Sequence, residues 1–165
     1  MNSNLNYFTS GTIFIDSNIF IYANSDNHPL KEVSNNFLIR LDESELKGVI
    51  NGRIIDEIYH KMLLIEVCHK YKINSNEALI LIKKTPNLLS EFEAPRDTIE
   101  DILNINNLII SKIDSQTIEN ALLFSKYLLF SDAIHVATCK ENGIKNMATN
   151  DKDFEKIDFL NIWKP

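Results

Sequence analysis

The sequence predicts a three-layer α/β/α fold with a central, mostly parallel sheet and extra helices in the middle of the chain. Apolar runs typical of buried strands alternate with amphipathic helical patterns, as expected for a parallel sheet covered on both faces. The length of 165 residues suits one domain, residues 1–165, with residues 72–106 as a helical elaboration within it.

The first half of the chain is expected to supply two strands and three helices. Ile13, Phe14 and Ile15 are consecutive apolar residues, which favours a strand buried on both faces, and Asp16 ends the run. The expected elements are a strand at 12–15, a short helix at 19–24 capped by Ser17 or Asn18, a helix over 33–41, a strand at 48–50 and a helix from 53 to about 70.

The second half continues the alternation after a helical middle segment. Pro86 and Pro95 punctuate residues 72–106, which otherwise have helical patterns. The remaining expected elements are a strand at 108–113, a helix capped at 114 or 115 and running to about 127, a helix at 132–142 capped by Ser131 and closed by Gly143, a strand at 144–148 and a short last strand at 159–163.

Composition excludes several classes of function. The net charge of −6 is unlike that of proteins that wrap duplex DNA by neutralising its phosphates. Cys68 and Cys139 stand alone without a C-x-x-C pair, which favours buried thiols in a reducing cytosol over zinc or a disulfide. The start of the chain lacks the apolar stretch of a signal peptide, and no apolar run approaches the roughly 18 residues of a membrane span. We expect no membrane association and a cytoplasmic location.

Acidic residues follow the predicted strands where a binding crevice is expected. Asp16 directly follows the strand at 12–15, Asp151 comes three residues after the strand at 144–148, and Asp132 opens a helix. Ligands of open α/β sheets bind outside the carboxyl ends of the strands. Glu57 lies on a helical face with Arg53; taken alone it resembles a solvated residue paired with a lysine four positions on.

Carboxylates gathered in one pocket repel one another, and a hard divalent cation removes that repulsion. Such ions can activate a water and neutralise a leaving oxygen of a phosphodiester. An acid-rich site that lacks cysteine therefore favours phosphoryl chemistry with Mg²⁺ or Mn²⁺ over zinc.

Four stretches resemble, in order and spacing, the motifs of the PIN-domain nucleases. They are FIDSNI at 14–19, IDEI at 55–58, SDAIHVAT at 131–138 and ATNDKDF at 148–154. The last two are the most specific, and the order and spacing of the four fit the family across about residues 12–160, nearly the whole chain.

The resemblance implies an endonuclease that cleaves single-stranded RNA with Mg²⁺ or Mn²⁺. It also implies that Asp16, Glu57, Asp132 and Asp151 are the catalytic, metal-binding carboxylates, because each matches its motif. The family includes VapC-like toxins paired with an antitoxin and free-standing PIN-domain proteins, so the resemblance implies a homodimer and an antitoxin partner as well.

Other polar residues near the motifs have two interpretations each. Asp153 either contacts the metal through water or caps the turn at 154–157. Ser17, Thr149 and Asn150 either position a water or a phosphate or are ordinary turn residues. Arg53 and Lys61 either contact a substrate phosphate or lie on a solvated helix face.

Three other functions compete with this hypothesis. Glu57-x-x-His60 and Asp132-x-x-His135 have the acid–histidine spacing of di-iron four-helix bundles, which would make the chain a non-haem iron protein. A phosphoaspartyl enzyme of the haloacid-dehalogenase type needs an acid where this chain has Asn18. A non-catalytic PIN-like module that binds RNA or protein would keep the fold without the activity.

The apolar residues of the middle segment point to a surface for a second copy of the chain. The run Leu79–Ile82 is apolar on every side of a helix, so we expect part of it to face a partner.

Overall fold

A computed structural model describes residues 3–43 and 46–165, and its centre is a six-stranded sheet in the order β1-β6-β5-β2-β3-β4. All the neighbouring strands pair in parallel. The strands are β1 (Ser3–Asn4), β2 (Thr12–Ile15), β3 (Lys47–Asn51), β4 (Leu108–Ser111), β5 (Asn146–Ala148) and β6 (Asn161–Lys164). The predicted parallel α/β architecture is confirmed.

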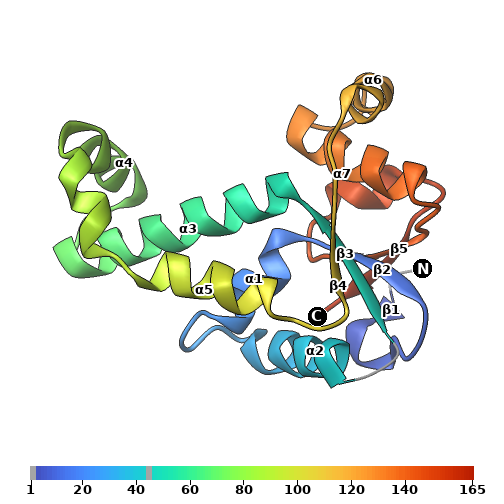
Figure 1. Cartoon of the computed structure of the whole chain (residues 1–165), viewed down its shortest axis with the longest axis horizontal. Helices are drawn as coiled ribbons and strands as arrows, with labels where there is room; N and C mark the ends of the chain where they lie inside the picture. The colour runs from blue at the N-terminus through green and yellow to red at the C-terminus, as the bar shows by residue number, and fades with distance from the viewer. Residues whose placement is uncertain (1–2, 44–45) are drawn as a thin grey trace.

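Helices cover both faces of this sheet (Figure 1). α1, α2, α3 and α5 lie on one side of the strands, and α6 and α7 pack against each other on the other side. None of the helices that the structure describes is long and apolar enough to cross a membrane. Their bounds are α1 (Ser17–Ala23), α2 (Lys31–Glu43), α3 (Gly52–Tyr71), α4 (Ser75–Lys84), α5 (Ala94–Leu103), α6 (Ser115–Phe124) and α7 (Phe130–Glu141), with the 3₁₀ turns η1 (Leu5–Tyr7), η2 (Pro86–Glu91) and η3 (Asp153–Lys156).

The register between β2 and β5 places the ends of these two strands side by side. Ile15 of β2 is the partner of Ala148 of β5, and the Asp16 N–H donates to the Ala148 carbonyl at 3.0 Å. Phe14 and Ile15 are fully buried, so this pair of strands is held in the main core. Asp16 and Thr149, which are 133 residues apart in sequence, consequently leave the sheet next to each other.

The first part of the middle segment, α4 and η2, forms an arm at the far end of α3, whereas α5 returns to the main core through Ile102. α3 extends beyond the sheet, and α4 and η2 pack on its distal half (Figure 1). A second apolar cluster, separate from the main core, forms there around Leu63, Val67, Ala78, Leu88 and Phe92. Leu81 and Ile82 pack against this cluster. These two residues therefore use part of their apolar surface within the arm, whereas Ile80 of the same run is 52% exposed, so the expectation that part of the run faces a second chain stays a prediction.

Several helix boundaries differ from the sequence prediction by one or two residues. α1 is capped by Asp16 rather than by Ser17 or Asn18. α7 begins at Phe130, so Ser131 is already helical and its side chain does not cap. Pro95 lies in the first turn of α5, where its missing N–H has no helical partner to lose. Gly143 ends α7 at φ +65°, as predicted.

The edge strand β1 escaped prediction because it has only two polar residues. β6 begins at Asn161, two residues later than expected, and β4 ends at Ser111 rather than at residue 113.

We predict that Gly48→Ala destabilises the protein by about 1–3 kcal/mol, the usual cost of overpacking a core. A Cβ at this position would lie 2.8 Å from Ile15 Cδ1 and 2.9 Å from side-chain carbons of Leu41 and Leu108. Denaturant unfolding gives the free energy. Gly52→Ala is the control: nothing lies within 4 Å of its added Cβ, and we expect no loss of stability. Equal effects of the two changes would contradict the packing argument.

Candidate active site

Asp16 lies at the junction of β2 and α1, with its carboxylate almost fully surrounded by donors. Its side chain caps α1: Oδ1 accepts from the Ser17 N–H at 2.7 Å. Oδ2 accepts from the Thr149 hydroxyl at 2.6 Å and from the Asn18 amide. Asp16 is only 7% exposed. A buried carboxylate is tolerated here because each oxygen has hydrogen-bond partners.

Thr149 connects this carboxylate to the loop after β5. Its hydroxyl donates to Asp16 Oδ2 and accepts from Asn18 Nδ2 at 3.1 Å and from the Asp151 N–H at 3.0 Å. The side chain is completely buried. Thr149 therefore fixes the position of Asp16 and the direction of the backbone that leads to Asp151, and it has no hydroxyl proton left for a substrate.

Glu57 approaches the site from the second turn of α3. Its Oε1 lies 3.5 Å from His135 Nε2 and 3.4 Å from Arg53 Nε. Ile54 and Ile58 are fully buried on the same helix and hold it against the sheet. The side chain of Glu57 is 18% exposed, so the interpretation of Glu57 as a solvated surface residue is wrong.

Asp132 and Asp151 complete the group of acids. Asp132 is half-buried in the first turn of α7. Asp151 is exposed, and its Oδ1 accepts from the N–H of Asp153, the first residue of η3, at 2.8 Å. We call Asp16, Glu57, Asp132 and Asp151 the four site carboxylates.

The pKa values of these acids show that their charges interact. Burial raises the pKa of Asp132, and the charges of Asp151, Asp16 and Glu57 raise it further, against the opposing effect of His135. Burial also raises the pKa of Asp16, and Glu57 adds to this, although the bonds from Thr149 and Ser17 and the nearby His135 oppose it. Asp132 therefore lies within electrostatic reach of the other three site carboxylates, and Asp16 within reach of Glu57.

Glu57 behaves differently from its neighbours. Burial would raise its pKa, but the interactions with His135, the Ser17 hydroxyl and Arg53 outweigh burial and lower it. The environment of Glu57 therefore favours its ionised form, whereas the environments of Asp16 and Asp132 disfavour theirs.

The other predicted residues are more loosely connected to this group. Asp153 is the first residue of η3, and its side chain forms an ion pair with Lys156 at 2.6 Å and does not cap the turn. Asn150 is exposed; its N–H donates to Asn18 Oδ1 and its amide to the Tyr22 hydroxyl, both at 3.4 Å. Lys61 lines an apolar groove beside Leu64, Ile65 and Cys68 on a later turn of α3.

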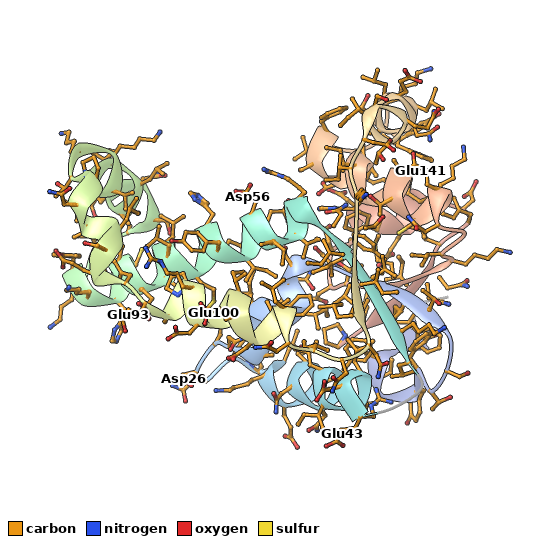
Figure 2. The ribbon with its side chains drawn as sticks, in the orientation of Figure 1. Asp26, Glu43, Asp56, Glu93, Glu100 and Glu141 are labelled. Carbon is orange, nitrogen blue, oxygen red and sulfur yellow. The ribbon has the colours of Figure 1, made fainter. Side chains whose placement is uncertain are left out.

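Arg53 is already paired with carboxylates. Its Nη1 lies 2.6 Å from Asp56 Oδ2, and its Nε contacts Glu57. Figure 2 shows Asp56 on the side of α3 away from α5. A phosphate bound by Arg53 would have to compete with these two acids.

The donor chemistry fits a hard divalent cation, because the four site carboxylates offer only oxygen ligands. In residues 3–43 and 46–165, no three acid, histidine or cysteine side chains are placed closely enough to share a metal ion. The di-iron hypothesis fails on the fold: a parallel sheet replaces the bundle, and His60 is exposed on α3.

Sequence reasoning missed the contribution of His135 and Asn51. His135 is 1% exposed and Asn51 is completely buried, and their side chains contact each other behind Glu57. In the sequence, Asn51 carries only the signal of a helix cap, and His135 was considered only as an iron ligand.

Comparison of the sequence with models of known protein families identifies the family of this chain. The model of the PIN domain matches residues 13–160, which include the four site carboxylates. The chain belongs to the PIN-domain family. This confirms the resemblance found in the four sequence motifs.

Known PIN-domain proteins resemble the chain over most of its length. Ribonuclease VapC2 of Methanocaldococcus jannaschii is 28% identical over 151 residues, 91% of each chain. The structure of Mycobacterium tuberculosis VapC20, a sarcin–ricin loop cleaving toxin, has a TM-score of 0.61 at 13% identity and covers 92% of this chain and 98% of that one. A toxin–antitoxin complex from Klebsiella pneumoniae gives 0.52 at 17% identity, covering 90% and 94%. The structural likenesses support the PIN fold.

We predict that Asp16→Asn raises the free energy of unfolding of the metal-free protein at neutral pH. The folded-state pKa of Asp16 lies above its ordinary value of 3.8. Protonated Asp16 therefore stabilises the folded state, and this stabilisation is lost as the pH rises through the folded-state pKa. Because asparagine carries no charge, the variant should be more stable than the wild type at neutral pH, and the difference in stability, measured by thermal unfolding in EDTA, should shrink as the pH falls toward 3.8.

Asp26→Asn is the control for this effect. Asp26 is exposed in Figure 2, and the hydrogen bond and charge of Lys31 lower its pKa, so its neutralisation should not stabilise the fold. A metal-free Asp16→Asn protein that is less stable than the wild type at neutral pH would show that the donors around Asp16 fully compensate its burial.

Proposed function

We propose that this chain is a divalent-metal-dependent endoribonuclease that cleaves single-stranded RNA as the toxin of a toxin–antitoxin pair. The observation that carries the proposal is the placement of acids from four separate segments at the carboxyl edge of the sheet, where the charges of Asp16, Glu57 and Asp151 all act on Asp132. Such a cluster is costly without a cation. The ribonuclease relative and the family membership support the reaction class.

Each site residue has a role in the proposed reaction. The four site carboxylates would hold Mg²⁺ or Mn²⁺, which supplies a water of lowered pKa and neutralises charge on the phosphodiester. Thr149 and Ser17 keep Asp16 in place. In-line attack of water on phosphorus breaks the bond to the 3′ oxygen, which leaves a 3′-hydroxyl and a 5′-phosphate.

The charge of the chain supports an unpaired substrate. With a net charge of −6, the protein has little cationic surface with which to hold a duplex by its phosphates. Unpaired bases can be read by contacts that an A-form duplex does not offer. We therefore propose single-stranded RNA as substrate, bound weakly and with strong salt dependence.

Two protein partners follow from the surface and the comparisons. The similarity to a toxin–antitoxin complex supports an antitoxin that covers the acidic site. A second copy of the chain is proposed to cover β4 and α6, because β4 is an edge strand and exposed apolar residues gather on these elements and the start of α7: Ile109, Ile110, Ile118, Leu122, Leu123, Leu129 and Phe130.

α6 is firmly attached to the domain and can serve as such a surface. Glu141 of α7 lies between the two helices in Figure 2, where its carboxylate accepts from Thr117 and Asn120 of α6. The exposed side of α6 is therefore presented on a fixed helix.

The second candidate function is a PIN-like module that binds RNA or protein without cleaving it. It requires no cation. The presence of all four site carboxylates favours the enzyme. The RNA cleavage assay described next separates the two functions.

We predict that Asp16→Asn, Glu57→Gln, Asp132→Asn and Asp151→Asn each reduce Mn²⁺-dependent cleavage of single-stranded RNA by more than about 100-fold, beyond the usual cost of changing a residue that only supports a metal ligand. Asp153→Asn is the matched control, because its carboxylate pairs with Lys156. Gel assays with labelled RNA measure the rates, and duplex DNA should remain uncut.

The outcomes separate the hypotheses clearly. If the wild type binds RNA but never cleaves it with Mg²⁺ or Mn²⁺, the binding module is correct. If Asp153→Asn is as inactive as Asp151→Asn, Asp153 also belongs to the metal site.

The dimer proposal predicts that Leu122→Glu yields a monomer near 19 kDa at micromolar concentration, while the wild type has twice that mass in light scattering. A charge cannot be buried in an apolar interface without a partner. Ile80→Glu on α4 is the control, because Ile80 is exposed to a similar extent, 52% against 57% for Leu122. A wild-type monomer would refute the proposal, and a Leu122→Glu dimer would place the interface elsewhere.

A further inference from the structure

A buried polar network lies directly behind Glu57. Asn51, at the end of β3, and His135 and Thr138, on α7, are each at most 1% exposed. Asn51 Nδ2 lies 2.9 Å from Thr138 Oγ1 and 3.2 Å from His135 Nδ1. The network connects the strand that precedes α3 with the helix that carries Asp132.

The hydrogen bonds of this network have a fixed direction. Asn51 Oδ1 caps α3 by accepting from the N–H groups of Arg53 and Ile54, both at 3.2 Å, so the amide NH₂ must face α7. The Thr138 hydroxyl gives its proton to the Ile134 carbonyl at 2.9 Å and therefore accepts from Asn51.

His135 Nδ1 is consequently an acceptor, and the neutral ring carries its proton on Nε2. The Phe14 ring lies against the imidazole, with centroids 5.5 Å apart. Nε2 is buried, has no hydrogen-bond partner of good geometry in the part of the chain that the structure describes, and faces Glu57 Oε1 at 3.5 Å. The network therefore directs an N–H at one oxygen of a site carboxylate.

A competing contact reaches the same oxygen from the solvent side. Arg53 Nε lies 3.4 Å from Glu57 Oε1, and this guanidinium also pairs with the exposed Asp56. Without a contact from the interior, the flexible Glu57 side chain would be free to follow Arg53 out of the site.

We propose that His135, oriented by Asn51, is a positioning residue that holds Glu57 Oε1 from the protein interior and presents the other carboxylate oxygen to a divalent cation. This inference rests on the proposed metal-dependent function. Residues that orient metal ligands in this way typically change metal affinity by about 10–100-fold when they are removed.

Metal binding without RNA tests the role of His135. In an electron paramagnetic resonance titration with Mn²⁺, His135→Ala should weaken binding by about 10–100-fold. His135→Gln should restore most of the affinity, because its amide can accept from Asn51 and donate to Glu57. His60→Ala is the control: this histidine is exposed on α3, and its loss should not change Mn²⁺ affinity.

The protonation of His135 tests the role of Asn51 even if His135→Ala fails to fold. In ¹⁵N-histidine NMR of the metal-free protein at mildly alkaline pH, wild-type His135 should carry its proton on Nε2. Asn51→Asp keeps the oxygen that caps α3 but replaces the NH₂ donor with an acceptor. It should move the proton to Nδ1 and weaken Mn²⁺ binding.

These results separate this inference from the function on which it rests. A wild type that binds no Mn²⁺ refutes the proposed metal-dependent function, and the inference with it. Wild-type Mn²⁺ affinity in folded His135→Ala, or wild-type His135 protonated on Nδ1, overturns the positioning role alone.

Discussion

The burial of negative charge at the carboxyl edge of the sheet is the constraint on which the site depends. Asp16 is fixed at the end of β2, and its neighbours offer hydrogen bonds from two directions: Ser17 and Asn18 on α1, and Thr149 after β5. These donors hold the carboxylate in place but do not fully compensate the burial of its charge, since its pKa remains raised. A charge that the protein orients but does not neutralise is suited to a cation.

Parallel pairing explains how such distant segments meet. In a parallel sheet all strands end at the same edge, so the residues that follow β2, β3 and β5 become neighbours without long loops. Asp16 directly follows β2, Asn51 is the last residue of β3, and Thr149 directly follows β5. Asn51 then caps α3 and so sets where Glu57 emerges. The polar residues that cap helices here also determine the geometry of the site.

The sequence was sufficient to predict the fold class and the acids that follow the strands. It was not sufficient to predict which side chains contact those acids. Strand β2 and the acid after it are visible because three apolar residues stop abruptly at Asp16. The partnership of His135 with Asn51 spans 84 positions and needs the packed structure to appear. The sequence also does not show that Asp153 pairs with Lys156 rather than capping the turn.

The apolar run Leu79–Ile82 shows what periodicity can and cannot predict. An all-apolar run indicates that apolar side chains point to every side of a helix, but it does not identify what covers each side. In the structure, the second apolar cluster on the distal half of α3 covers Leu81 and Ile82 in part, and Ile80 stays exposed. Exposed apolar side chains are also present on β4 and α6.

The arrangement of α3 separates the site from the arm. Glu57 lies in the proximal part of the helix, which Ile54 and Ile58 anchor in the main core. The arm begins beyond Met62 and is stabilised by its own cluster around Val67 and Phe92. The two clusters do not share their buried residues, so the proximal and distal parts of α3 are held by different contacts. The contacts that decide the orientation of Glu57 come from His135 and Arg53, on either side of the helix start.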